Sequence, residues 1–205
     1  MRLRPSGASG LLVSSLGAFA RYQENEAWTW EHQALVRARV LVGSQDVGQA
    51  FEKVRAQVLG KPRDLAKLQQ EVSEMRAKMR DNLGTRSTAA GTAANAFDAG
   101  VPFDLKQDAG GIVDIEFMVQ YAALAWSHSH PPLLRWTDNI RILEELEHEG
   151  LMPAEDASLL REAYKAFRSA AHRQALQKDA GVIAGDQFVE ERQQVLRIWK
   201  ELGLS

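Results

Sequence analysis

Apolar residues recur at helical spacing along most of this chain. Between residues 63 and 83 they lie three or four positions apart: Leu65, Leu68, Val72, Met75, Met79 and Leu83. Residues with this spacing share one face of an α-helix, so the pattern predicts a core-facing helix that ends at Gly84. Glu74 and Lys78 stand four residues apart and are expected to form an ion pair on the solvated side.

The same periodicity, together with capping residues and glycine or proline stops, predicts helices over most of the remaining chain. The expected ranges are 16–25, 28–42, 43–62, 110–126, 138–148, 153–178 and 187–202. Ser15 is the expected N-cap of the first helix, and Thr137 is the expected cap of the helix over 138–148. Pro153 stands in the first turn of the helix that follows.

Three segments depart from the helical pattern. Leu3 and residues 11–13 flank a turn rich in Pro, Ser and Gly, which predicts two short strands. Residues 84–102 are mostly small and predict a flexible Ala/Gly-rich loop. Residues 103–106 follow as a short extended segment. The chain is therefore expected to be mainly α, with a little β structure.

Composition excludes several classes of protein. The chain has 205 residues, of which 45% are hydrophobic, and a formal net charge of −2. Its apolar fraction is too high for a disordered tail, and no apolar run approaches the roughly 20 residues that span a bilayer. The absence of cysteine excludes a disulfide scaffold, a thiolate zinc site and a cysteine nucleophile. The near-neutral charge argues against a general nucleic-acid binder.

Asp114 and Glu116 are two positions apart in an apolar run. On a strand they would share a face and could hold Mg²⁺. On a helix they would lie about 200° apart and could not chelate one ion. The length of the run favours the helix, with both carboxylates in its first turn.

The segment from Gly43 to Asp46 resembles the opening of a nucleotidyltransferase signature, in which Gly-Ser precedes an Asp-x-Asp pair. Val47 and Gly48 stand where the second Asp should follow. Without that pair the segment cannot supply two metal ligands. It is interpreted as the C-cap of one helix and the N-cap of the next.

The histidines show no spacing typical of metal ligands. They are His32, His128, His130, His148 and His172. Two ligands on one helix face need a fixed spacing, as in His-Glu-x-x-His, and none is evident here. Each histidine is expected to be structural or to lie on the surface.

Residues 28–39 combine two tryptophans with polar groups of both charges. On a helix, Glu31 and Arg39 fall roughly in line, and Gln33 and Arg37 form a second polar row. A helix that only packs does not need polar groups on several sides. The segment is either an Arg-bearing surface for an anionic ligand or a salt-bridge network with tryptophan as core filler. The residue types alone leave both interpretations open.

Several long strings carry a family resemblance. They are Arg2-Leu3-Arg4-Pro5-Ser6-Gly7, Tyr22-Gln23, Glu26 to Arg39, Glu71-Val72, Met75 to Arg80, Phe103 to Lys106, Gly110 to Phe117, Gln120-Tyr121 and Trp136 to Leu143. Together they resemble the bacterial glutamine synthetase adenylyltransferase/adenylyl-removing enzymes over nearly the whole chain. The string from Ala27 to Gln33 is similar to the C-terminal, adenylylating half of that family.

The resemblance implies a nucleotidyltransferase that uses Mg²⁺ and ATP to attach AMP to a tyrosine of glutamine synthetase. In the family, the Arg-Leu-Arg-Pro string follows the third metal-binding carboxylate, and this chain begins at that string. The catalytic carboxylates are therefore expected upstream of Met1, and the chain alone is expected to bind neither Mg²⁺ nor ATP. The resemblance places six residues at the nucleotide or substrate site: Arg2, Arg4, Glu31, Gln33, Arg37 and Arg39.

The expected architecture has two parts. Residues 1–60 are the C-terminal remnant of a polymerase-β-like nucleotidyltransferase domain, with short strands and helices, and residues 61–205 are a helical bundle. The resemblance implies a cytoplasmic protein whose partners are glutamine synthetase and the PII signalling protein, without nucleic acid or membrane. The fragment is expected to be inactive alone.

Two alternatives to an inactive enzyme fragment stay open. The first is a free-standing helical interaction module that binds glutamine synthetase or PII. The second is a small metalloenzyme that uses Asp104, Asp114 and Glu116. Shared coordination of one ion requires these three carboxylates to converge within about 5 Å of one point, and a helix over 112–126 would count against it.

Overall fold

The computed structural model describes residues 13–85, 97–178 and 181–204, which are mainly helical as predicted. The elements are α1 (Leu16–Asn25), α2 (Thr29–Val36), α3 (Gln45–Leu59), α4 (Leu65–Leu83), β1 (Pro102–Asp104), α6 (Ile112–Trp126), the 3-10 helix η2 (Pro131–Leu134), α7 (Asn139–His148), α8 (Ala154–Leu176), β2 (Val182–Ala184) and α9 (Val189–Glu201). No helix in these ranges is both long enough and apolar enough to cross a bilayer.

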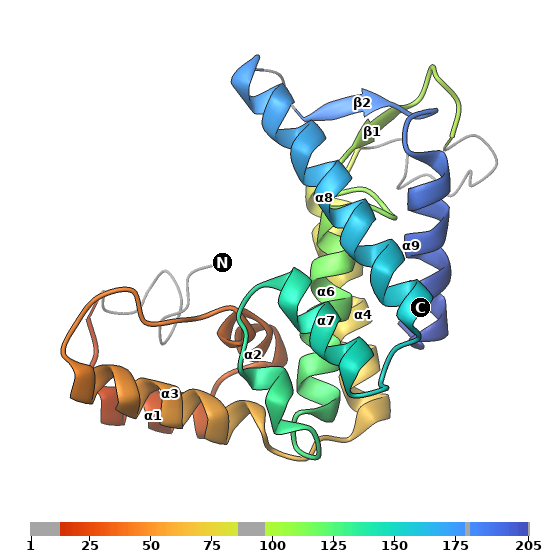
Figure 1. Cartoon of the computed structure of the whole chain (residues 1–205). Coiled ribbons are helices and arrows are strands. Elements are labelled where there is room, and N and C mark those ends of the chain that lie inside the picture. The colour runs from red at the N-terminus through yellow and green to blue at the C-terminus, as the bar shows by residue number, and fades with distance from the viewer. Residues whose placement is uncertain (1–12, 86–96, 179–180, 205) are drawn as a thin grey trace.

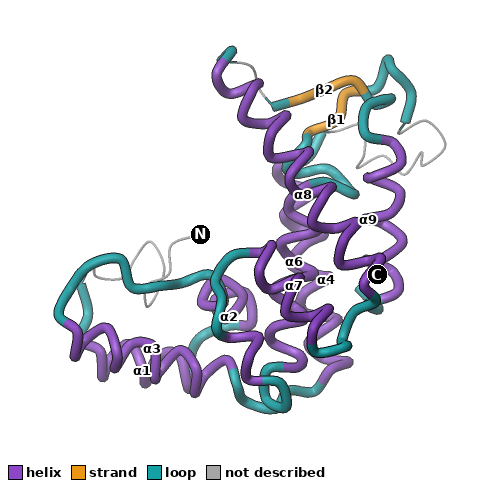
Figure 2. The backbone as a smooth tube through the Cα atoms, in the orientation of Figure 1, coloured by secondary structure: helices purple, strands orange, loops and turns teal. Residues whose placement is uncertain are grey.

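The helices form a layer and a bundle. α1 and α3 lie side by side as a two-helix layer, while α4, α6, α7, α8 and α9 stand together as an upright bundle (Figure 1). α2 lies where the layer and the bundle meet, and packs against α3, α4 and α6. The tube view shows the two short strands at the upper end of the bundle, away from the α1–α3 layer (Figure 2).

α6 is the central helix of the bundle. All of its residues are buried except Glu116 and Trp126, which are half-buried. A helix that is apolar on every side must be surrounded by other elements, and α2, α4, α7, α8 and α9 all pack against it. Leu35, Val72 and Phe167, from three of these helices, join it in one hydrophobic core.

Asp114 places a negative charge inside this core, in the first turn of α6. Its side chain is fully buried, with Oδ1 2.5 Å from Nε of Arg76 in α4 and Oδ2 accepting the backbone N–H of Gly110 at 2.7 Å. Arg76 is equally buried and also donates to the carbonyl of Gln107 at 2.7 Å. Burial lowers the pKa of Arg76, and the nearby Asp114 partly opposes this. Because a lone charge is costly to bury, the pair holds the start of α6 against α4.

The two glycines before α6 are required by close backbone contacts. Gly110 has a positive φ of 85°, and a Cβ there would lie 2.8 Å from the carbonyl oxygen of Arg192. A Cβ on Gly111 would lie 2.7 Å from the carbonyl oxygen of Leu105. Any larger residue would push these segments apart, so the Gly-Gly pair sets the turn into α6, where the sequence predicts the helix to open.

β1 and β2 pair antiparallel, with Phe103 opposite Ile183. The extended segment predicted at 103–106 corresponds to β1, but the sequence pattern did not predict β2. Each strand has three residues, too few to show the alternation that marks a strand. The fully buried ring of Phe103 packs under the guanidinium of Arg192, 3.6 Å from the ring centroid. Burial lowers the pKa of Arg192 to about 10.

The helix predicted over residues 28–42 is too long, because α2 ends at Val36. Arg55 of α3 reaches the last carbonyls of α2: its Nε donates to Leu35 O at 3.2 Å and its Nη2 to Val36 O at 2.7 Å. A guanidinium that occupies these acceptors ends the helix at this point. Residues 37–44 then leave as a loop.

The buried Arg55 side chain also reaches the bundle. Its Nη1 donates to Leu134 O at 2.8 Å, and its Nη2 lies 3.4 Å from Trp136 O. The loop that replaces the predicted helical turn carries Leu41 and Val42, which are exposed. One side chain of α3 therefore fixes the end of α2 and the segment between α6 and α7.

Other predicted boundaries lie close to the observed ones, with two corrections. Ser15 caps α1 as predicted, accepting the backbone N–H of Ala18 at 3.2 Å. Ser44 is the N-cap of α3, but no helix ends at Gly43. The cap of α7 is Asp138 and not Thr137, because the Asp138 carboxylate accepts a backbone N–H in the first turn.

Part of the predicted non-helical structure lies outside the described residues. This applies to Leu3, to residues 11 and 12 of the second predicted strand, and to residues 86–96 of the predicted loop. Val13 is an exposed loop residue. Residues 97–101 form turns that lead into β1.

Removal of one partner of the buried ion pair should destabilise the chain strongly. We expect Arg76→Met to lower the free energy of unfolding by about 3 to 5 kcal/mol, because Asp114 then loses its fully buried partner and keeps only the longer, partly exposed contact with Arg80 at 3.6 Å. The measurement is the midpoint of urea unfolding, compared between variants whose free energy of unfolding depends equally steeply on urea concentration. Lys67→Met on the same helix is the control, because the pair of Lys67 with Glu71 is exposed and should contribute less than about 1 kcal/mol. Equal losses in the two variants would contradict the role given to Arg76.

Candidate functional site

The predicted site residues do not all lie together. Arg2 and Arg4 lie outside the described residues. Glu31 is on α2 and is buried, with its carboxylate accepting the Tyr22 hydroxyl at 2.8 and 3.0 Å. It also accepts the backbone N–H of Trp28 at 3.0 Å. The Glu31 carboxylate therefore fixes the first turn of α2 and joins it to α1.

Gln33 and Arg37 face the bundle. Gln33 is buried, and its Nε2 donates to Oε1 of Gln120 in α6 at 3.3 Å. Arg37 stands at the C-terminal end of α2 and donates to Oε1 of Glu116 at 2.8 Å. The Tyr164 hydroxyl of α8 donates to the same oxygen at 3.1 Å. These contacts join α2, α6 and α8, as the salt-bridge interpretation of residues 28–39 expects.

Arg39 lies apart from Glu31, Gln33 and Arg37, in the loop after α2. It lines a depression of about 410 Å³ between this loop, α1 and α3, together with apolar side chains such as Phe19 and Phe51. Leu41 and Val42 of the same loop also line it and are exposed. The structure thus places Arg39 on a different surface from Glu31 and Gln33, and a nucleotide or substrate role for the six residues stays a prediction.

The structure contradicts the alternative of a metalloenzyme that uses Asp104, Asp114 and Glu116. Both Asp114 and Glu116 are on the helix α6, where one pairs with Arg76 and the other with Arg37. Asp104 closes a turn, with Oδ1 accepting backbone N–H groups from the two residues 106 and 107 at 2.8 and 3.0 Å. Among the described residues these three carboxylates do not converge on one point. Each is engaged in holding the fold.

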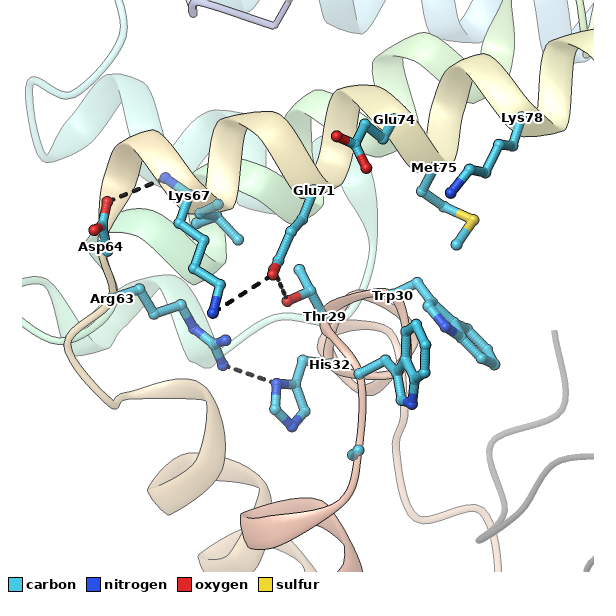
Figure 3. Close-up of a pocket in the computed structure, with 13 residues that line it drawn as sticks. Thr29, Trp30, His32, Arg63, Asp64, Lys67, Glu71, Glu74, Met75 and Lys78 are labelled. Carbon is cyan, nitrogen blue, oxygen red and sulfur yellow. Dashed lines mark hydrogen bonds and ion pairs between the residues drawn. The ribbon is translucent and has the colours of Figure 1, made fainter.

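A pocket of about 660 Å³ opens between the start of α2 and the first half of α4 (Figure 3). Two tryptophans and His32 form its α2 side, and charged side chains of both signs form its α4 side. The lining residues are Ala27, Trp28, Thr29, Trp30, His32, Arg63, Asp64, Lys67, Leu68, Glu71, Glu74, Met75 and Lys78. The tryptophan-rich string singled out in the sequence therefore lines a hollow, which core filler alone would not explain.

His32 joins the α2 wall to Arg63 at the base of the pocket. Its Nε2 lies 2.9 Å from the carbonyl oxygen of Gln23. Its Nδ1 lies 3.1 Å from Nη2 of Arg63 (Figure 3). Because a carbonyl only accepts and a guanidinium only donates, the ring is neutral, with its proton on Nε2. Burial lowers the pKa of His32; the Gln23 carbonyl opposes this shift and the charge of Arg63 adds to it.

The acids in the pocket are partly engaged, which leaves the tryptophans and a lysine for a ligand. Glu71 accepts the Thr29 hydroxyl at 2.5 Å and lies 3.8 Å from Nζ of Lys67. Figure 3 shows Lys78 on α4 beyond Met75, on the same side as Trp30. Trp28 is 70% exposed. Exposed indole beside fixed charges of both signs is typical of surfaces that recognise another protein.

The sequence did not point to α4 as a wall of this pocket. Its charged positions, taken as the solvated back of a core helix, follow helical spacing of their own: Arg63, Lys67, Glu71, Glu74 and Lys78. That second stripe was the available signal. The predicted pair of Glu74 with Lys78 is not formed, because Glu74 accepts the Gln70 amide at 2.9 Å.

The neutral state of His32 predicts a pH dependence of stability. Because the folded chain lowers this pKa below 6.5, the unfolded chain binds the proton more readily. The free energy of unfolding is therefore expected to fall as the pH drops from about 7.5 to about 5.5. We expect His32→Asn to show a smaller fall, measured by urea unfolding at both pH values.

His172→Asn is the matched control for this experiment, because His172 is an exposed residue of α8. It should retain the full pH dependence. An identical pH dependence in the His32 variant and the unaltered chain would show that His32 is not held neutral.

Comparison with known proteins divides the sequence between two family profiles. The family described as glutamate-ammonia ligase adenylyltransferase matches residues 1–54. The family described as GlnD PII-uridylyltransferase matches residues 73–196, more than half of the chain. Together the two matches cover α1, α2 and most of the bundle.

Individual relatives extend the match over the complete sequence. Bifunctional glutamine synthetase adenylyltransferase/adenylyl-removing enzymes from Pseudomonas putida, Pseudomonas syringae pv. tomato and Pseudomonas aeruginosa are 82%, 80% and 73% identical to it over all 205 residues. The chain spans 21% of the length of each of these relatives. The resemblance found in the sequence is thereby confirmed, and the chain belongs to the glutamine synthetase adenylyltransferase/adenylyl-removing enzyme family, about one fifth of whose length it represents.

Proposed function

We propose that the chain is part of the adenylylating half of an enzyme that transfers AMP from ATP to a tyrosine of glutamine synthetase and also removes it. The observation that carries this proposal is the 82% identity, over every residue, to the Pseudomonas putida relative. The string from Ala27 to Gln33 supports the adenylylating half. A cytoplasmic location and a role in nitrogen regulation belong to the same proposal.

The proposal divides the chain at about residue 60. Residues 1–60 would complete a nucleotidyltransferase domain, and residues 61–205 would form the helical bundle that follows. The separate family profiles over residues 1–54 and 73–196 support this division. In the described residues the two parts are in contact through α2, which packs against both α4 and α6.

Neither Asp114 nor Glu116 fits a site for Mg²⁺ and ATP. Asp114 is held by Arg76, and Glu116 is held by Arg37 and Tyr164. A metal that bridges phosphates needs carboxylate oxygens that are free to coordinate it. We therefore assign no catalytic step to these groups, and propose that the chain alone does not transfer AMP.

The pocket between α2 and α4 gives the chain a role in recognition. It offers exposed indole and charges of both signs, which suit a segment of a protein better than a single small anion. We assign it to docking of glutamine synthetase. In the same proposal, Arg2 and Arg4 would act beside the phosphates, where guanidinium groups form charge-assisted hydrogen bonds.

A second candidate function is a helical module that binds the PII protein. The match of residues 73–196 to the GlnD PII-uridylyltransferase family favours it. That range includes Glu74, Met75 and Lys78 of the pocket. The two candidate functions predict different binding partners for the same chain.

The absence of catalysis is tested by incubating the chain with glutamine synthetase, Mg²⁺ and ATP labelled at the α-phosphate. We expect no transfer of label to glutamine synthetase, whereas the full-length Pseudomonas putida relative in the same assay should label it. Label transfer by the chain at a rate like that of the full-length enzyme would refute this part of the proposal.

The docking role is tested by measuring binding of the chain to immobilised glutamine synthetase and, separately, to immobilised PII. We expect binding to glutamine synthetase, with Trp28→Ala weakening it about 30-fold, because a central tryptophan typically contributes about 2 kcal/mol. Leu176→Ala is the matched control, since Leu176 is 72% exposed and Trp28 is 70% exposed. We expect Leu176→Ala to bind glutamine synthetase with the affinity of the unaltered chain.

Two other outcomes decide between the candidates. Binding to PII without binding to glutamine synthetase would favour the second candidate function. Equal affinity of the Trp28 variant and the unaltered chain for glutamine synthetase would refute the assignment of docking to this pocket.

A further inference from the structure

The C-terminal end of α7 carries a group of potential metal ligands to which the proposed function gives no role. One ligand atom each from Glu145, His148 and Glu149 lies within 4.8 Å of the other two. Such a separation lets one ion contact all three after small side-chain rotations. The group is far along the chain from the α2–α4 pocket and shares no residue with it.

The helix itself brings these residues together. Glu145 and His148 are three positions apart and Glu149 is four from Glu145, so all three lie on one face of α7 and its cap. Glu-x-x-His is a recurrent metal-binding motif of helical bundles. From the sequence, no histidine was expected at a metal-ligand spacing, whereas Glu145 and His148 have this spacing on α7.

Both carboxylates are already oriented by neighbours. The indole N–H of Trp136 donates to Oε2 of Glu145 at 3.2 Å, and Nδ1 of His130 lies 2.7 Å from Oε2 of Glu149. Within the described residues, Oε1 of each carboxylate makes no hydrogen bond. Hydrogen bonds from outer groups that orient the ligands are a regular feature of metal sites, where they increase affinity.

The charge around the group favours a cation. Near the C-terminus of a helix, carboxylates face the negative end of the helix dipole, which is unfavourable unless a positive charge is present. Of the nearby arginines, Arg161 pairs with Glu147, and Arg141 lies over the Trp136 ring at 4.4 Å from its centroid. Among the described residues, neither a lysine nor an arginine pairs with Glu145 or Glu149.

We propose that Glu145, His148 and Glu149 form a binding site for Zn²⁺, with His130 as the positioning residue for Glu149. One imidazole nitrogen and two carboxylate oxygens are ligands that Zn²⁺ accepts, and a water molecule completes four-coordination. The imidazole disfavours Mg²⁺ and Ca²⁺, which prefer oxygen ligands throughout. The bound ion joins the end of α7 to the segment after α6 through His130. This proposal does not depend on the proposed function.

The test is isothermal titration calorimetry, in which ZnCl₂ is titrated into the chain after dialysis against EDTA and removal of the chelator. We expect one saturable equivalent of Zn²⁺ and no comparable binding of Mg²⁺. His148→Ala and Glu145→Gln should each weaken binding by at least about tenfold, and His130→Ala should weaken it by about tenfold through loss of orientation. All three residues are at least partly exposed, and circular dichroism confirms that each variant is folded.

The matched control is His172→Ala, which removes an exposed histidine outside the group and should leave Zn²⁺ affinity unchanged. Co²⁺ gives an independent measurement, because a four-coordinate nitrogen and oxygen site produces visible absorption that His148→Ala should abolish. The proposal is overturned if the chain shows no saturable equivalent, or if His148→Ala and Glu145→Gln bind Zn²⁺ as the unaltered chain does.

Discussion

The fold depends on a carboxylate being neutralised where water does not reach it. α6 is buried on nearly every side, and the carboxylate of Asp114 in its first turn is compensated there by Arg76, by the backbone N–H of Gly110 and, at 3.6 Å, by Arg80. Arg76 in turn binds the carbonyl of Gln107. The segment between β1 and α6 is thus held at two points, the carbonyl of Gln107 and the N–H of Gly110. The apolar sides of α6 bring the other helices around it, and these polar contacts fix where α6 begins against α4.

α4 connects this core to the candidate recognition surface. Its inner face carries Leu68, Val72 and Arg76, all buried, while its outer face carries the charged wall of the pocket. The α2 wall is equally constrained, because Glu31 fixes its first turn from the inside. The pocket is therefore built on two helices whose positions are set by buried polar contacts. Rigid support of this kind suits a docking surface, since little order must be gained on binding.

The sequence predicted what depends on local pattern and missed what depends on distant partners. The helices α1, α3 and α4 follow from spacing and caps, and the turn into α6 follows from two glycines. The early end of α2 could not be predicted from local pattern, because it depends on Arg55, a residue of another helix. For the candidate site, the tryptophan string indicated an unusual surface, but only the packing of α2 against α4 shows which charges face it. The spacing of Glu145 and His148 is visible in the sequence, but the hydrogen bond by which Trp136 orients Glu145 is not.

Arg55 imposes a one-sided constraint on sequence change. It binds main-chain carbonyls of Leu35, Val36 and Leu134, and every amino acid offers a carbonyl. The side chains at those positions can therefore vary without loss of these bonds, whereas Arg55 cannot be replaced by a residue with fewer donors. Among aligned family sequences such a residue would be invariant, without covariation with the three positions whose carbonyls it binds. Methods that infer contacts from correlated substitutions would not detect the link that joins α2, α3 and the segment before α7.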